Sequence, residues 1–377
     1  MKNISLLLLL FCNTSIAQFN KIKPGKYKPG FISITRFDAS RPAVKEQAVQ
    51  DKGRIIQINL WYPSVGGIRK MRMTDYAALA GKELDSSELP GWTQAGIDKY
   101  FAWPVSAGAD KNLIASFLNK QQPMLAFMNA DWIKQKMPLV IMVHGFAADY
   151  AYMAEYLSSF GYVVLQVPVK GTTQYELDYE GLGLETQVKD NEFAIGVLQK
   201  EFPWFSDKAA AVGFSFGGQS AVALALRNKF IKSVVSLDGG IGSAFGAGLL
   251  SNQLYYSDSL VTMPLLHLYN AADSYTDLSW FKYISKANRL LVPVKNMQHG
   301  YFTSFGLLEK DVPGLMGKNI ANPGNGYETV MLLTKQFVVS AINAGNTGLA
   351  GFLGEQKNVY PWIKDCIGEA KLFLSGS

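Results

Sequence analysis

The run Gly213-Phe214-Ser215-Phe216-Gly217 sets a serine between two glycines in a G-x-S-x-G pattern. The residues before it, Lys208–Val212, are typical of a short buried strand, and those after it, Gln219–Leu226, of a buried helix. A sharp turn between a strand and a helix strains the serine backbone and exposes its hydroxyl. The glycines leave room for that turn, and the helix points its first amides at the reacting centre. The pattern predicts a nucleophilic Ser215, although an ordinary glycine-rich turn could show the same five residues.

A serine hydroxyl becomes a good nucleophile when a base removes its proton, and histidine is the usual base because its pKa lies near neutrality. The chain has three histidines, His144, His267 and His299. His267 lies inside an apolar strand-like run, which is typical of a buried histidine with a satisfied hydrogen bond. His299 comes after Ser215 and follows the last predicted strand, so it would lie in a loop at a carboxyl end. We therefore predict that His299 is the base.

An acid is needed to hold the tautomer of the histidine and to stabilise its charged form. Two aspartates follow predicted strands between Ser215 and His299. Asp238 comes after the strand-like run Ile231–Leu237, and Asp273 comes after the next such run. Both agree with the chain order serine, acid, histidine. The residues by themselves leave both aspartates open.

Strands and helices alternate along most of the chain. Strands are predicted at 139–143, 163–167, 209–212, 231–237, 264–269 and 290–294, and helices at 150–160, 184–200, 219–226, 278–284 and 327–343. This spacing predicts an α/β fold with a mainly parallel, doubly wound sheet that has helices on both faces. Ligands of such sheets bind at the carboxyl ends of the strands.

Two further β-rich segments, Phe31–Arg36 and Ile55–Tyr62, come first. The second alternates polar and apolar residues, which predicts a half-buried antiparallel strand. The segment Arg72–Lys136 is rich in Ala, Gln, Met and Trp, with isolated prolines. We interpret it as an inserted helical segment, at about 72–136, without a strong strand and placed to cap the site.

Several segments together resemble the platelet-activating-factor acetylhydrolase and dienelactone-hydrolase-like group of the α/β-hydrolase superfamily. The resemblance covers most of the chain from about Phe31. It rests on Val44–Pro63 with Asn59-Leu60-Trp61-Tyr62-Pro63, Val143-His144-Gly145-Phe146, Gly213–Gly218, Leu237-Asp238-Gly239 and His299-Gly300-Tyr301-Phe302. The serine turn and the His-Gly pair are shared by the whole superfamily, whereas the Leu-Asp pair and the phenylalanine three residues after the histidine are more specific.

The resemblance implies an α/β-hydrolase fold and assigns further roles. In the acetylhydrolase branch the acid follows the strand directly after the serine turn, which implies Asp238, whereas most α/β-hydrolases carry it where Asp273 lies. In the superfamily, the loop that begins with the His-Gly pair and the residue after the nucleophile each donate one amide to the oxyanion. This implies the amides of Phe146 and Phe216. Dienelactone hydrolases proper have a cysteine nucleophile, where this chain has Ser215.

We therefore expect a serine esterase that forms an acyl-enzyme through Ser215, His299 and Asp238. One form of this expectation is an acetylhydrolase-like enzyme, which prefers acetyl esters. The alternatives are a peptidase or a polyester or lipid hydrolase on the same triad. A further alternative is a non-catalytic protein that binds a glycan or lipid with Trp92, Trp103 and Trp132 of the insertion. No cluster of His, Cys and Asp has ligand spacing, so neither a metal nor another cofactor is expected.

The first residues predict export. Lys2 precedes a short apolar run, and Ser15-Ile16-Ala17 is a small-residue cleavage site, which together predict a signal peptide at 1–17 and a periplasmic or secreted single domain at 18–377. Bulky Phe11 before Cys12 disfavours a lipid anchor. Cys366 would then be the remaining cysteine, so no internal disulfide is expected.

The net charge of +6 is modest and unclustered, which disfavours nucleic acid as a partner. No later apolar run has the length of a transmembrane segment.

Overall fold

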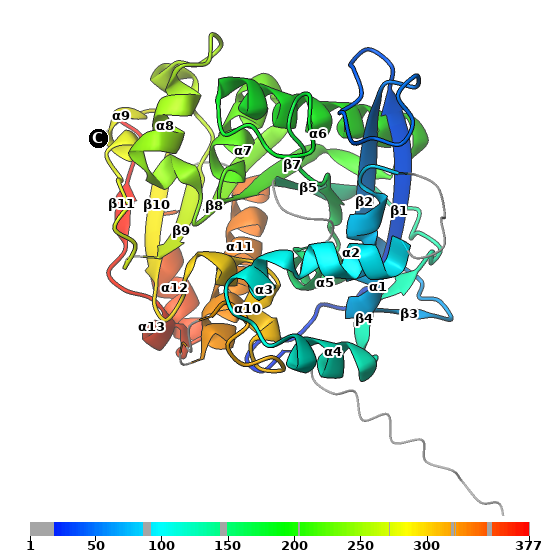
Figure 1. The fold of residues 1–377 in the computed structure, drawn as a ribbon. Helices are drawn as coiled ribbons and strands as arrows, with labels where there is room; N and C mark the ends of the chain where they lie inside the picture. Colours follow the sequence, from blue (N-terminus) through cyan, green and yellow to red (C-terminus); the bar gives the residue numbers. More distant parts are fainter. Residues whose placement is uncertain are drawn as a thin grey trace, which may run out of the picture.

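The structure is a computed structural model that describes residues 19–85, 92–143, 149–202, 204–270, 272–317, 320, 322–344 and 349–376. The predicted signal peptide with Cys12 and the segment 144–146 lie outside these ranges. The strands within them are β1 (Lys28–Asp38), β2 (Arg54–Ser64), β3 (Lys70–Arg72), β4 (Pro123–Met128), β5 (Met137–Val143), β6 (Val163–Gln166), β7 (Phe205–Phe214), β8 (Ile231–Leu237), β9 (Leu265–Asn270), β10 (Arg289–Val294) and β11 (Lys371–Phe373). They form one eleven-stranded sheet in the order β11-β10-β9-β8-β7-β5-β6-β2-β1-β4-β3, which crosses the molecule in Figure 1.

The centre of the sheet is parallel. Strand β5 pairs in parallel with β6 and β7, and the pairing continues in parallel from β7 through β8 and β9 to β10. This confirms the predicted mainly parallel sheet. Because β6 lies on one side of β5 and β7 on the other, the strand order reverses between β5 and β7. Ligands of parallel sheets bind in the crevice at such a reversal, and Ser215 directly follows β7 at this point.

The two β-rich segments at the start of the chain form β1 and β2. They pair antiparallel over their full length, from Lys28 opposite Ser64 to Asp38 opposite Arg54. The prediction that the second strand is half-buried is wrong, because all of its residues are buried. Strand β2 lies between β1 and β6, and it is contacted by α5 (Ala151–Ser159) and α6 (Gly181–Glu201), which belong to the cores on opposite faces of the sheet.

Helices cover both faces of the sheet. On one face lie α6, α7 (Gly217–Arg227) and α8 (Ala244–Ser251), and on the other lie α5 and α11 (Pro323–Ala344), as Figure 1 shows. Strand β5 contributes to both cores, since Val140 and Met142 enter one and Leu139 and Ile141 enter the other. Successive residues of a strand point to opposite faces, so a continuous apolar run is what a strand covered on both sides requires.

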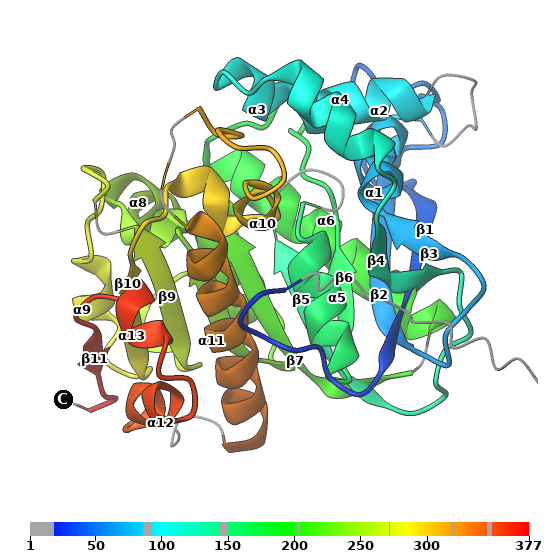
Figure 2. The ribbon, with the colours of Figure 1, turned by 90° about the horizontal axis from the view of Figure 1, so that it is seen from below.

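The segment Arg72–Lys136 contains helices and one strand that was not predicted. The helices are α1 (Met73–Ala78), α2 (Trp92–Tyr100), α3 (Ala102–Ser106) and α4 (Lys111–Asn119), which lie together at one end of the molecule in Figure 2. The expectation of no strong strand is wrong, because β4 pairs in parallel with β1 and antiparallel with β3. Its sequence, PMLAFM, is rich in the helix formers Met, Leu and Ala, so pairing with β1 outweighs local propensity.

The last third of the chain follows the prediction less closely. Helix α11 includes the predicted helix 327–343, but α9 (Trp280–Tyr283) is shorter than the predicted helix 278–284. After α11 the chain forms two short helices, α12 (Phe352–Val359) and α13 (Ile363–Cys366). Strand β11 was not predicted, and it extends the sheet by pairing antiparallel with β10.

Candidate active site

Ser215 lies in the tight turn between β7 and α7. Its φ angle is +54°, a left-handed conformation that costs a residue other than glycine about 1–3 kcal/mol. Its amide donates to the carbonyl of Leu237 (3.2 Å), and its carbonyl accepts from the amide of Gly218 (2.9 Å). A Cβ atom on Gly213 would lie 2.0 Å from the carbonyl oxygen of Gly217. The turn therefore closes only with glycine at position 213, and it holds the serine at the carboxyl edge of the sheet.

The imidazole of His299 lies between Ser215 and Asp238. Its Nε2 atom is 2.9 Å from Ser215 Oγ, and its Nδ1 atom is 2.8 Å from Asp238 Oδ2. An ionised carboxylate can only accept hydrogen bonds, so Nδ1 carries the proton of the neutral ring and Nε2 accepts from the serine hydroxyl. This is the tautomer that a general base requires. His299 begins the short 3₁₀ helix η4 (His299–Phe302) after β10.

Asp238 directly follows β8 and is held on both sides. Its φ angle is +44°, and its amide donates to the carbonyl of Leu268 in β9 (2.7 Å). Oδ1 accepts from the amide of Asn270 (2.8 Å), while Oδ2 accepts from His299. The side chain is only 8% exposed. The carboxylate is thus fixed to the neighbouring strand through one oxygen and to the imidazole through the other.

Asp273 lies near the site, but its carboxylate serves its own loop. Its Oδ1 atom accepts from the amide of Tyr275 (2.9 Å), and its amide donates to the carbonyl of Asn270 (3.2 Å). The atom that an acid must contact is Nδ1 of His299, which is bonded to Asp238. Of the two aspartates that the sequence left open, the geometry favours Asp238.

His267 lies in the middle of β9 and is buried. Its Nδ1 atom is 2.9 Å from Ser236 Oγ, and its ring stacks on Tyr269 with a centroid distance of 5.2 Å. Burial lowers its pKa to about 4, against the opposing effect of the negative charge of Asp238. His267 is therefore the buried, hydrogen-bonded histidine that the sequence indicates, neutral at physiological pH.

Aromatic residues flank the ring of His299. The ring of Phe214 lies 4.7 Å away, measured between centroids, and that of Trp103 in α3 lies 6.3 Å away. Trp103 also packs edge-on against Phe305 (6.2 Å). At Gly300, an added Cβ atom would lie 3.1 Å from Cη2 of Trp103. The segment predicted as an insertion thus brings a tryptophan next to the histidine of the site.

The tryptophans proposed as an aromatic binding set do not share one location. Trp103 lies beside His299, whereas Trp132 stacks on Tyr62 of β2 with a centroid distance of 3.7 Å and an interplanar angle of 5°. The side chain of Trp92 lies outside the described part. Of the two tryptophan side chains of this set that the structure describes, Trp103 is therefore the one that lies at the site of Ser215.

The residue after the serine, Phe216, is the N-cap of α7. Its backbone is already helical, with φ −55° and ψ −27°, so the amino end of the helix and its partial positive charge lie beside Ser215. The other predicted donor, the amide of Phe146, lies outside the described residues, as does His144. Both oxyanion assignments stay predictions.

Two cavities meet at Ser215. The histidine-side cavity has a volume of about 250 Å³ and extends over the ends of β8 and β9; its lining includes Ser215, Phe216, His299, Ser243, Asp273 and Thr276. The tryptophan-side cavity has a volume of about 330 Å³; its lining includes Ser215, Phe214, Trp103, Phe305, Val169 and Leu177. Tyr179 lines both cavities.

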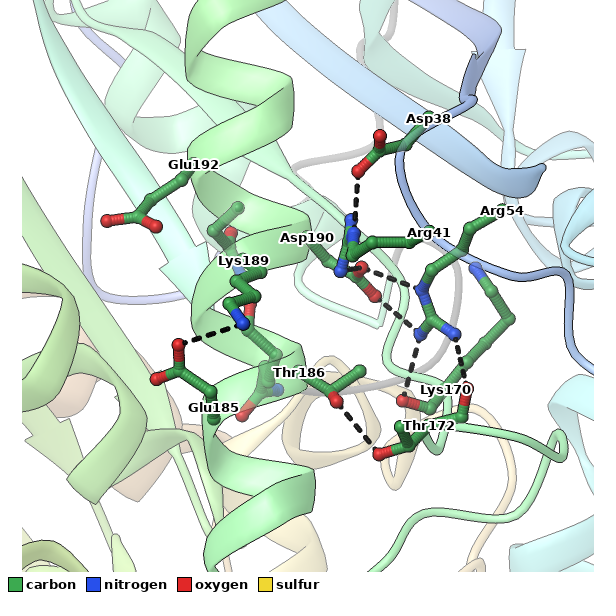
Figure 3. A network of polar contacts seen from close by, with 12 residues as sticks. Asp38, Arg41, Arg54, Lys170, Thr172, Glu185, Thr186, Lys189, Asp190 and Glu192 are labelled. Carbon is green, nitrogen blue, oxygen red and sulfur yellow. Dashed lines mark hydrogen bonds and ion pairs between the residues drawn. The ribbon is translucent and has the colours of Figure 1, made fainter. Parts of the chain in front are cut away.

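The loop 167–180, which follows β6, forms part of the walls of both cavities, and a buried ion pair holds its first half. Arg54 in β2 donates to both carboxylate oxygens of Asp190 in α6 (2.8 and 2.7 Å) and to the carbonyls of Lys170 and Gly171 (3.3 and 2.9 Å), as Figure 3 shows. Burial by itself would raise the pKa of Asp190, but the charge and hydrogen bonds of Arg54, together with the charges of Lys170 and Arg41, outweigh this effect and lower the pKa. The fully buried amine of Lys170 has no hydrogen-bond partner among the described residues, and burial lowers its pKa to about 8.

Sequence reasoning did not identify this loop. Its residues Val169, Leu177 and Tyr179 line the cavities but belong to no recognisable motif. The available signal was its length, since a long connection at the carboxyl edge of a parallel sheet often carries function.

Within the described ranges, no group of three or more His, Cys, Asp and Glu side chains is arranged to hold a metal ion. In the same part of the chain, no helix combines the length and apolar character needed to cross a membrane. Cys366 is half-buried, and burial raises the pKa of its thiol.

Comparisons with known proteins establish the fold. No protein-family model matches this chain, and no curated protein matches it. Among solved structures, it is similar to a ferulic acid esterase from Streptomyces cinnamoneus, with a TM-score of 0.57 and 16% sequence identity over 88% of this chain and 96% of the other. At this identity the likeness concerns the fold and not the activity. Taken with the sheet order and the serine turn, it shows that the chain has an α/β-hydrolase fold.

Proposed function

We propose that this protein is an esterase that hydrolyses a carboxylic ester, with Ser215 as nucleophile, His299 as general base and Asp238 as the acid that orients the histidine. The observation that carries the proposal is the hydrogen-bonded chain from Ser215 Oγ through His299 to Asp238, with distances of 2.9 and 2.8 Å. The α/β-hydrolase fold and the similarity to an esterase of known structure support it.

In the first half of the reaction, Ser215 Oγ attacks the carbonyl carbon of the ester while its proton passes to His299 Nε2. The electron pair of the carbonyl moves to its oxygen, and the amide of Phe216 stabilises that oxyanion together with the proposed amide of Phe146. A donor of this kind contributes about 3 kcal/mol to the transition state. The ester C–O bond then breaks, and the alcohol oxygen takes the proton from His299.

In the second half, water replaces the alcohol. His299 Nε2 removes a proton from the water, whose oxygen attacks the carbonyl carbon of the acyl-enzyme. When the bond to Ser215 Oγ breaks, the serine recovers its proton from His299 and the carboxylic acid leaves. Asp238 keeps the imidazole in one tautomer and stabilises its positive charge during both halves. None of these steps requires a cofactor.

Two further parts of the proposal concern the rest of the chain. Residues 1–17 act as a signal peptide, which makes the mature domain, 18–377, a periplasmic or secreted enzyme. Helices α1–α4 act as a cap over the site, for which the contact between Trp103 and His299 is the supporting observation. The resemblance to acetylhydrolases suggests acetyl as one acyl group of the substrate. The size and lining of the two cavities are a second source of evidence on the acyl group.

The test is hydrolysis of short p-nitrophenyl esters by the mature protein and by Ser215→Ala. We expect the variant to lose at least 10³-fold in kcat and to lose labelling by a fluorophosphonate, with unchanged thermal unfolding. Ser206→Ala is the matched control, because Ser206 lies at the other end of β7. Equal turnover by Ser215→Ala would refute the proposal. Cleavage of peptide amides in preference to esters would instead identify a peptidase on the same triad.

A further inference from the structure

The tetrahedral intermediate on Ser215 has three groups besides the serine oxygen, and each needs a place. The leaving oxygen must lie within reach of His299 Nε2, and the oxyanion must face the amide of Phe216. His299 and Phe216 both line the histidine-side cavity, and neither is among the described residues that line the tryptophan-side cavity. The third group, the acyl chain, therefore has the second cavity left to it.

We propose that the tryptophan-side cavity binds the acyl group of the substrate and that the histidine-side cavity binds the alcohol. This inference rests on the proposed esterase function and deepens it. Ser215 lines both cavities, as Tyr179 does, so an ester bound across the serine places its carbonyl carbon at the nucleophile. Trp103, Val169 and Leu177 then determine which acids are accepted.

The walls of the tryptophan-side cavity call for an apolar acyl group. Its described lining includes the apolar side chains of Trp103, Val169, Leu177, Phe214 and Phe305, together with the polar side chains of Asp149, Glu176 and Thr303. The cavity volume is about 330 Å³, roughly ten times the 30 Å³ that a group the size of a water molecule takes up in a liquid. An acetyl methyl would leave most of this space unfilled. The cavity therefore has room for an apolar acyl chain or ring longer than acetyl.

The histidine-side cavity is lined by aromatic residues as well, among them Phe216, Phe245 and Tyr269, but it adds several hydrogen-bonding side chains. Its lining includes the side chains of Gln219, Ser243, Asp273 and Thr276, which can donate to or accept from hydroxyl groups. The leaving group that suits this wall is a polar alcohol with further hydroxyl groups. The substrate class is therefore an ester of an apolar acid with a polyhydroxy alcohol.

The first experiment varies the acyl chain and keeps p-nitrophenol as leaving group, from acetate to octanoate. Burial of one methylene corresponds to a factor of about four in kcat/KM, so we expect hexanoate to exceed acetate by at least tenfold. Val169→Phe narrows the tryptophan-side cavity, and it should lower the ratio of kcat/KM for octanoate to that for acetate at least tenfold. Leu177→Ala widens the same cavity and should move the optimum to longer chains.

Thr276→Phe is the matched control, because it adds similar bulk to the histidine-side cavity. We expect it to leave the ratio of octanoate to acetate within twofold of the wild type. At constant butanoyl group, glyceryl monobutanoate should be a better substrate than propyl butanoate for the wild type, and Thr276→Phe should slow the glyceryl ester at least fivefold.

The outcomes separate the two proposals. If no ester is hydrolysed in a Ser215-dependent way, the esterase function itself fails. If esters are hydrolysed but acetate is preferred, or if Val169→Phe slows acetate and octanoate equally, the assignment of the cavities is overturned and the esterase stands. A change in acyl-chain preference caused by Thr276→Phe, or a preference for propyl butanoate, would overturn it as well.

Discussion

Replacement of Asp238 by asparagine tests the triad with almost no change in shape. In the structure, Oδ1 accepts from the amide of Asn270 and Oδ2 accepts from His299 Nδ1. An asparagine has one accepting oxygen and one donating nitrogen, so it cannot reproduce both bonds. If its oxygen stays on Asn270, its NH₂ group faces Nδ1 and forces the proton of His299 to Nε2. That tautomer cannot accept the proton of Ser215.

The expected loss follows from this wrong tautomer. A substitution of this type in a serine triad costs roughly 10⁴-fold in kcat, which corresponds to about 5 kcal/mol of transition-state stabilisation. The measurement is kcat and kcat/KM for a p-nitrophenyl ester at pH 8, with thermal unfolding to verify the fold. Asp273→Asn is the comparison and should lose far less activity than Asp238→Asn, because the carboxylate of Asp273 bonds to the amide of Tyr275 in its own loop and not to His299. A variant of Asp238 that retains more than a tenth of the activity, or a larger loss from Asp273→Asn, would refute the reasoning.

Three further predictions concern buried groups and the serine turn. Lys170→Met should raise the free energy of unfolding by about 1–3 kcal/mol at pH 7, because the amine is buried without a hydrogen-bond partner among the described residues and its pKa is lowered to about 8. The gain should shrink as pH rises from 8 towards 10.5, and a destabilised variant in urea titrations would contradict this prediction. The pKa of His267 is lowered from 6.5 to about 4, so its contribution to the free energy of unfolding, at most about 3 kcal/mol, is present above pH 6.5 and is lost as pH falls towards 4. His267→Gln should therefore show a flatter pH dependence of stability over that range. Equal slopes for the variant and the wild type would show that His267 is not the source of the dependence. Gly213→Ala should lose at least 100-fold in kcat/KM, since its Cβ atom would lie 2.0 Å from a backbone oxygen. Gly196→Ala in α6 is the control and should leave activity unchanged, because the added atom meets nothing within 4 Å. Similar kinetics for both variants would show that the turn tolerates a side chain.

Much of the fold could be predicted because local pattern and tertiary environment agree. Strands such as β5, β8 and β10 are short apolar runs between segments with helical periodicity. A short, continuous apolar run is the pattern typical of a strand that is covered on both faces. Strands β4 and β11 could not be predicted, since they form only where a neighbouring strand offers its edge. Burial of β2 on both faces depends likewise on helices that are distant in sequence.

For the site, the sequence by itself determined the nucleophile candidate and its turn, because G-x-S-x-G is a local pattern whose geometry depends on its own glycines. With three histidines in the chain, it also indicated His299 as the base. The residues by themselves left Asp238 and Asp273 open, and the family resemblance implied Asp238. The structure places Asp238 on His299 Nδ1, and this 2.8 Å hydrogen bond depends on how two loops meet in space. The two cavities at Ser215 arise in the same way, since Trp103 and the loop 167–180 meet only in the folded chain.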